Sequence, residues 1–88
     1  MSVVTYQCKQ YSVGMAKTIE AVYQEVGKRI TKERKRQGMS QDRISGASGV
    51  DRSHIGFIEQ GRRKPTLATL YKIANALHVS LEELFRGL

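Results

Sequence analysis

Apolar residues recur at helical spacing along most of the chain, which predicts an all-α protein. The first run begins near residue 18, and Gly38 is expected to end it. Its apolar positions follow one another at intervals of three and four residues, and basic residues gather on the other side, at Lys28, Arg29, Lys32, Lys35 and Arg36. We therefore expect a long amphipathic helix with an inward apolar face and an outward basic face. The inward residues are Ile19, Val22, Val26 and Ile30.

Two shorter helices follow, joined by a glycine-containing turn. Ser40 is a favourable N-cap for a helix over Gln41–Ser48, and Gly49 allows an abrupt reversal of the chain. Asp51 is a second N-cap, and Gly61 is expected to end the helix that it begins. The apolar residues expected to hold this pair against a common core are Ile44, Val50, Ile55 and Ile58.

Two further helices complete the pattern. Pro65 stops any helix from running through, and Thr66 is placed to cap the next one. Ser80 and Glu83 have the spacing of a capping box for a short last helix that ends at Gly87. The apolar stripe of the longer helix contains Leu67, Leu70, Ile73, Ala74 and Leu77. The pattern predicts five helices in one compact bundle.

The N-terminal stretch Met1–Lys17 does not continue the helical pattern. Several valines and tyrosines give it β propensity, but there is no turn or partner strand. It is either a flexible arm or a short strand that pairs with its copy in a dimer. It holds Cys8, the chain's one cysteine, which cannot form an internal disulfide and favours a reduced, cytoplasmic protein.

The charge balance narrows the class of partner. The 88 residues carry a net charge of +7 with a pI near 9.9, which points to nucleic acid first and an acidic membrane second. No apolar run is long enough to cross a membrane. The few cysteines and histidines are too scattered for zinc, so we expect no metal and no cofactor. His54 and His78 lack a nucleophile or acid partner, so we expect no enzyme activity.

The stretch Ser40–Gly61, SQDRISGASGVDRSHIGFIEQG, resembles the helix-turn-helix of the Cro/lambda-repressor (XRE) family. The continuation RRKPTLATLYKIANALHVSLEELF is similar to that family's last two helices. Within the family, DRSHIGFIEQGRRKPTLATL is most similar to the small controller proteins of restriction-modification systems. The resemblance implies a five-helix lambda-repressor-like DNA-binding domain over residues 18–88.

The implied function is a dimeric transcription regulator that binds a palindromic operator in double-stranded DNA. The resemblance leaves open whether the chain activates or represses, and whether RNA polymerase is a further partner. An alternative is an antitoxin or coactivator-like module that uses the same fold to bind protein. A membrane role is not expected, because the bundle needs the apolar side of the first helix.

Three residues are expected to read bases from the second helix of the motif. Arg52 has the planar fork that pairs with guanine O6 and N7. Ser53 is expected to donate to or accept from a base or a phosphate. Phe57 either meets a thymine methyl or folds back over Arg52, and both readings stay open. Gly56 beside it would let backbone approach DNA closely.

Other residues are expected to hold the protein in place. The DNA-backbone contacts are expected from Ser40, Gln41, His54, Arg62, Arg63 and Lys64. The resemblance also implies an ion pair between Arg34 and Glu59, behind the recognition helix. Ser45 stands where alanine is usual in the family. The expected dimer interface is the apolar C-terminal end, which comprises Val79, Leu81, Leu84, Phe85 and Leu88.

Overall fold

The computed structural model describes residues 17–88, and within them it contains five α-helices and no strand. They are α1 (Ile19–Arg36), α2 (Gln41–Ser48), α3 (Arg52–Glu59), α4 (Leu67–Leu77) and α5 (Leu81–Phe85). The all-α prediction and the order of the helices are confirmed. The predicted N-terminal arm lies outside the described residues apart from its last residue, Lys17, and so does Cys8.

The helices begin where their capping residues predict. The side chains of Ser40, Asp51 and Thr66 each accept a hydrogen bond from a backbone N–H in the first turn of α2, α3 and α4 respectively. Ser80 and Glu83 form the predicted capping box at α5. Gly49 closes α2 in the left-handed conformation, with a φ of 76°.

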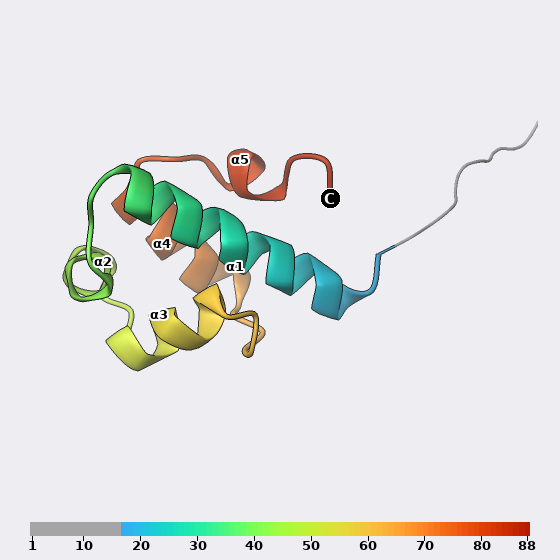
Figure 1. Ribbon diagram of the computed structural model, residues 1–88, viewed down its shortest axis with the longest axis horizontal. Helices are drawn as coiled ribbons and strands as arrows, with labels where there is room; N and C mark the ends of the chain where they lie inside the picture. The colour runs from blue at the N-terminus through green and yellow to red at the C-terminus, as the bar shows by residue number, and fades with distance from the viewer. Residues whose placement is uncertain (1–16) are drawn as a thin grey trace, which may run out of the picture.

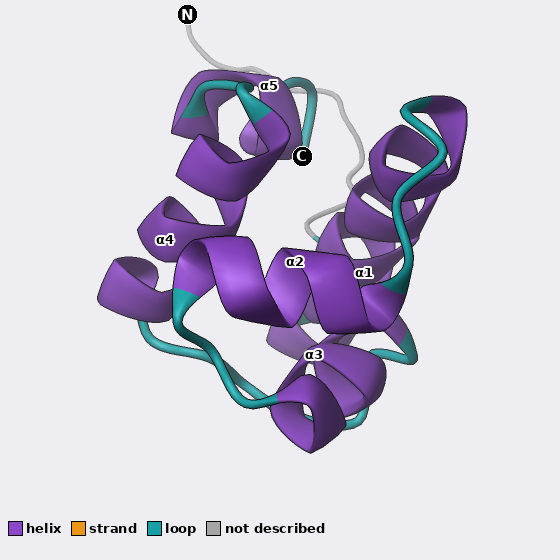
Figure 2. Ribbon diagram, turned by 90° about the vertical axis from the view of Figure 1, so that its left-hand side faces the viewer, coloured by secondary structure: helices purple, strands orange, loops and turns teal. Residues whose placement is uncertain are grey.

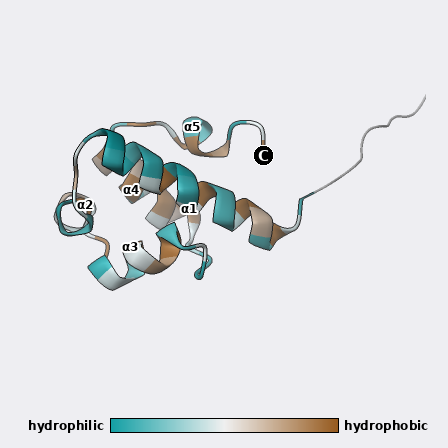
Figure 3. Cartoon of the chain, in the orientation of Figure 1, coloured by the Kyte–Doolittle hydropathy of each residue, from teal (hydrophilic) through white to brown (hydrophobic). Residues whose placement is uncertain are grey.

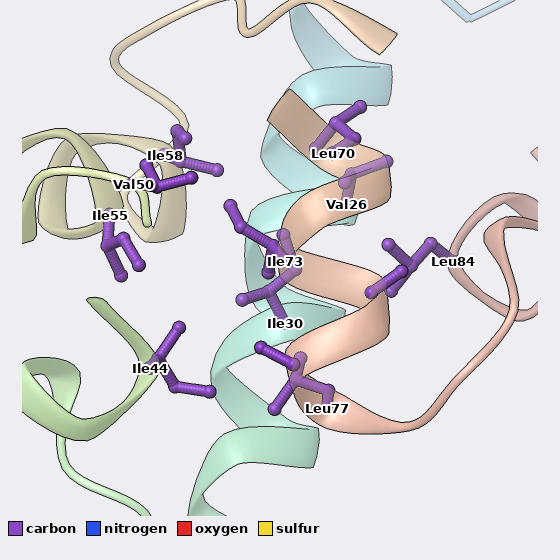
Figure 4. Packing of buried hydrophobic residues seen from close by; sticks show 12 residues of the cluster. Val26, Ile30, Ile44, Val50, Ile55, Ile58, Leu70, Ile73, Leu77 and Leu84 are labelled. Atoms are coloured by element: carbon purple, nitrogen blue, oxygen red, sulfur yellow. The ribbon is translucent and has the colours of Figure 1, made fainter. Parts of the chain in front are cut away.

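The long helix α1 is the centre of the bundle (Figures 1 and 2). It contacts α3, α4 and α5, while α2 packs on α3 and α4. Side chains from all five helices meet in one core (Figure 4). Its largest fully buried members are Val26, Ile30, Ile44, Ile55, Ile58, Ile73 and Leu77.

Two residues predicted to face inward are exposed. Ile19 is 53% exposed and Leu67 is 63% exposed. Each is the first residue of its helix, and Figure 1 shows the N-terminal end of α1 extending beyond the other helices. The inward prediction is therefore wrong for these two residues, because a helical period carries no information on how far the neighbouring helices extend.

A glycine sets the distance between α1 and α3. A Cβ atom on Gly27 would lie 2.3 Å from the carbonyl oxygen of Ile58 and 2.8 Å from that of Glu59. Atoms cannot approach so closely, so the absence of a side chain lets the end of α3 rest on the backbone of α1. Nothing in the sequence around Gly27 indicates that another helix approaches it so closely.

Candidate nucleic-acid interface

The start of α3 presents exposed polar side chains. Arg52 and Ser53, both predicted to read bases, are exposed on the first turn, and this end of the helix is hydrophilic (Figure 3). The Nε of Arg52 lies 2.8 Å from Oδ1 of Asp42 on α2. With 60% and 78% of the two side chains exposed, the pair adds little stability, but it gives the arginine a preferred direction.

A buried ion pair holds α3 from behind. Arg34 donates from Nε and Nη2 to the carboxylate of Glu59 at 2.7 and 3.1 Å. The Nη1 of Arg34 donates to the carbonyl oxygen of Met39 at 2.8 Å. Only 11% of the arginine side chain and 5% of the glutamate side chain are exposed. The pair therefore links α1, α3 and the chain leading into α2.

Gln41 joins this network from the first position of α2. Its Nε2 donates to Oε1 of Glu59 at 3.0 Å, which ties the start of α2 to the end of α3. Burial raises the pKa of Glu59, but the hydrogen bonds from Arg34 and Gln41 outweigh it and hold the pKa below its usual value. The carboxylate is charged at neutral pH, so both donors stay in place.

Phe57 does not fold back over Arg52. The ring centroid lies 4.8 Å from the guanidinium carbon of Arg63 and 5.4 Å from that of Arg62. The side chain of Arg52 is engaged by Asp42, whereas the turn after α3 carries the other two arginines back toward the ring. The alternative in which Phe57 packs over Arg52 is therefore wrong. Contact with a thymine methyl remains a prediction.

The remaining predicted backbone contacts are spread around α2 and α3. Ser40 is exposed, and its hydroxyl caps α2, while His54 is half-buried. Lys64 lies 3.0 Å from the carboxylate of Glu20 at the start of α1. The hydrogen bond from Lys64 lowers the pKa of Glu20. Lys64 is therefore directed toward α1, away from the first turn of α3.

Two arginines on the basic side of α1 are engaged within the chain. Arg29 pairs with Glu25 and donates to the carbonyl oxygen of Leu84 at 3.1 Å. Arg36 pairs with Glu33, and with a further hydrogen bond from Gln37 it lowers the pKa of that carboxyl to about 2. These two arginines therefore stabilise the helix and its contact with α5.

The predicted dimer surface needs one correction. Leu84 is 2% exposed and lies in the core, where α5 packs against α1 and α4, so it has no surface left for a partner (Figure 4). It is the one buried residue of this five-residue helix, so its side chain attaches α5 to the core. The other four predicted residues are half-buried against the same core: Val79, Leu81, Phe85 and Leu88.

Two polar contacts in the motif were not anticipated. The hydroxyl of Ser45 donates to the carbonyl oxygen of Val50 at 2.6 Å and closes the turn between α2 and α3. Asp42, in the first turn of α2, makes the second contact by pairing with Arg52. A serine in place of a small apolar residue was a weak signal for the first contact, and the pairing of Asp42 with Arg52 had none.

Residues 17–88 do not bring together three or more side chains of the kind that bind metals. None of the helices described there is long and apolar enough to span a membrane.

Comparison with known proteins decides the family. Residues 30–84 match the HTH_3 family model, which is described as helix-turn-helix. The chain belongs to the HTH_3 helix-turn-helix family. The match begins in the last two turns of α1 and continues through most of α5, so it includes the complete α2–α3 motif and the ion pair behind it.

The relatives of this helix-turn-helix chain are regulators. It is 39% identical over 59 residues to an HTH-type transcriptional regulator, y4dJ of Sinorhizobium fredii, across 67% of this chain and 77% of that protein. The restriction-modification controller protein C.AhdI from Aeromonas hydrophila superposes with a TM-score of 0.71 at 37% identity, covering 74% and 98% of the two chains.

A second controller protein, C.Esp1396I, was solved as a tetramer with its natural 35-base-pair operator. It superposes with a TM-score of 0.68 at 33% identity, over 73% of this chain and 84% of that one. Family and relatives together identify this helix-turn-helix chain as a DNA-binding regulator of transcription. The resemblance to controller proteins is confirmed.

Proposed function

We propose that this regulator acts as a homodimer on a palindromic operator and that it is a controller protein of the restriction-modification type. The observation that carries the proposal is the exposed first turn of α3, held rigidly from behind by a buried ion pair. A major groove admits one helix, and residues at its N-terminal end lie nearest the base edges. Controller proteins of this fold support the narrower assignment.

The exposed side chains of α2 and α3 would contact different parts of the DNA. Arg52 is the residue for a guanine, because contact with Asp42 occupies its Nε and leaves both terminal nitrogens to donate. Ser53 stands beside it for a base or a phosphate. Gln41, at the positive end of α2, contacts a phosphate with the amide hydrogen that Glu59 does not use.

The second subunit packs against the C-terminal end of the bundle. The half-buried residues there are the ones available for a partner: Val79, Leu81, Phe85 and Leu88. Such a dimer places two copies of α3 about one helical turn of DNA apart. Sedimentation analysis should show a dimer at micromolar concentration, and a strictly monomeric chain contradicts this part of the proposal. A regulator of this kind works at the cytoplasmic nucleoid.

The decisive experiment is selection from randomised duplex DNA, followed by binding of the selected duplex. We expect a palindromic site. Arg52→Ala should weaken binding to it by about 1–3 kcal/mol and relax the preference at one base position in each half-site. Equal loss on selected and random DNA excludes base reading by Arg52. If no sequence is enriched, the regulator proposal is wrong and a protein-binding role takes its place.

A further inference from the structure

The turn after α3 brings two arginines against one aromatic ring. Arg62 and Arg63 place their guanidinium carbons 5.4 and 4.8 Å from the centroid of Phe57. We propose that Phe57 is a positioning residue that holds these two arginines as a clamp for the phosphates of one DNA strand. This inference rests on the proposed function, because it requires that the outer face of α3 meets a duplex.

The backbone explains why these three residues meet. Gly61 has a φ of 73°, its N–H donates to the carbonyl oxygen of Ile58 at 3.0 Å, and the N–H of Arg62 donates to that of Phe57 at 2.9 Å. This pattern is a Schellman ending, which places the side chain after the glycine against the side chain three residues before the cap. An apolar residue is common at that outer position. Here it is an arginine, and it lies over a ring.

A second feature makes the turn rigid. A Cβ atom on Gly61 would lie 2.7 Å from the side chain of Gln24 on α1, so the turn rests closely against the long helix. The left-handed φ and this close approach both favour glycine. The two arginines therefore start from a backbone of fixed direction.

The charges leave the clamp open to an anion. The arginines Arg29, Arg34 and Arg52 each pair with a carboxylate, but within residues 17–88 neither clamp arginine does. Arg62 donates from Nη1 to the neutral amide oxygen of Gln60, at 3.3 Å. The face of an aromatic ring attracts cations without neutralising them. Phe57 thus reduces the repulsion between two like charges and preserves both for phosphate.

The clamp lies at the opposite end of α3 from Arg52. The C-terminal end of a helix carries partial negative charge, which repels phosphate, and the two cations there reverse its sign. Both ends of α3 then attract DNA, one with a base-reading arginine and the other with backbone contacts. The clamp accordingly adds affinity that does not depend on sequence.

Three substitutions separate the ring from simple apolar volume. Phe57→Leu removes the aromatic face, whereas Phe57→Trp keeps a stronger one. Tyr71→Leu removes a ring from α4 that is 54% exposed, and it is the matched control. Binding is measured by fluorescence anisotropy on the selected duplex and on random duplex, at several salt concentrations. A thermal melt by circular dichroism confirms that each variant is folded.

We expect Phe57→Leu to weaken binding about fivefold on both duplexes and to reduce the dependence on salt. Phe57→Trp and Tyr71→Leu should bind as the wild type does. In a chain that carries Arg62→Ala and Arg63→Ala, Phe57→Leu should have no further effect. Wild-type binding by Phe57→Leu overturns the clamp, and so does a full further loss in the double-alanine background. A changed preference at one base position, with random duplex unaffected, shows instead that Phe57 meets a thymine methyl.

The clamp and the proposed function fail in different ways. If selection enriches no sequence, the regulator proposal fails. The effect of Phe57→Leu on binding to random duplex still tests the clamp in that case. The free protein gives a further reading, because ring currents should shift the side-chain protons of Arg63 upfield in its NMR spectrum. That shift should vanish in Phe57→Leu and persist in Phe57→Trp. Its absence from the wild type overturns the positioning role.

Discussion

On its inner face, α3 rests directly on the backbone of another helix, whereas on its outer face Arg52 and Phe57 lie against charged side chains. The inner contacts are the approach to Gly27 and the pair of Arg34 with Glu59, a glutamate that is 5% exposed at its side chain. The outer contact of Arg52 with Asp42 is 60% and 78% exposed. The direction of α3 is therefore set without the residues expected to read bases, which leaves those residues free to determine specificity.

Glu59→Gln is the strongest test of the inner face. The substitution leaves the guanidinium of Arg34 buried without a carboxylate, and we expect a loss of about 3–5 kcal/mol in the free energy of unfolding. Chemical denaturation followed by circular dichroism measures it. Glu20→Gln is the control, because it breaks an exposed pair with Lys64 and should change stability little. Similar small losses in both variants would mean that the inner pair does not fix α3.

The same pair predicts how stability depends on pH. The folded-state pKa of Glu59 lies below its usual value of 4.5. Its contribution is therefore complete above that value and is lost as pH falls through the lower folded-state pKa. Glu59→Gln should remove this part of the acid sensitivity. Some pH dependence of stability should remain near pH 2 in this variant, because the pKa of Glu33 is lowered to about 2. An unchanged acid profile in the variant would contradict the assignment.

Gly27→Ala tests the close approach of the two helices. A methyl group there would meet two carbonyl oxygens of α3, at 2.3 and 2.8 Å, so we expect a loss of about 1–3 kcal/mol as α3 moves away. Gly46→Ala is the matched control inside a helix, because its Cβ would meet no atom within 4 Å. That change should raise stability by up to about 1 kcal/mol. If both variants are more stable than the wild type, α3 has room to shift.

Ser45→Ala tests how the turn between α2 and α3 is closed. It removes the hydrogen bond to the carbonyl oxygen of Val50, and the expected loss of stability is about 0.5–1.5 kcal/mol. Alanine is the better helix former, which offsets part of that loss. The reverse exchange at an exposed site of the same helix, Ala47→Ser, measures the offset alone. If Ser45→Ala is as stable as the wild type after this correction, the hydrogen bond to Val50 does not stabilise the turn.

The comparison also explains which features could be predicted from the sequence. Helix ends depend on neighbouring residues, so the caps at Ser40, Asp51 and Thr66 could be predicted directly. The inner apolar positions follow a period, and α3 presents Ile55 and Ile58 to the core as expected. Family resemblance supplied the fold and the partners of the buried ion pair, which periodicity alone does not indicate.

Contacts between distant residues were beyond such reasoning. Nothing beside Gly27 in the sequence indicates that α3 will touch it, and the exposure of Leu67 depends on where other helices end. The outer face was the hardest part, because Phe57 had several cations within reach of its ring. A turn geometry that brings Arg62 and Arg63 back over α3 decided the outcome. Which arginines lie against Phe57 thus depends on the three-dimensional fold and not on residue type.

Gly56→Ala gives the smallest change and tests where the inner and outer faces of α3 meet. A Cβ atom there would lie 3.9 Å from the amide of Gln41, an ordinary contact, so the fold does not require this glycine. We expect stability to rise by up to about 1 kcal/mol, as for Gly46→Ala. If backbone at Gly56 approaches DNA closely, the added methyl should still weaken binding to every duplex severalfold, whereas Gly46→Ala should not. Anisotropy measured beside a thermal melt separates the two effects. Equal binding by both variants would place the DNA contact on side chains alone and leave the glycine without a role in it.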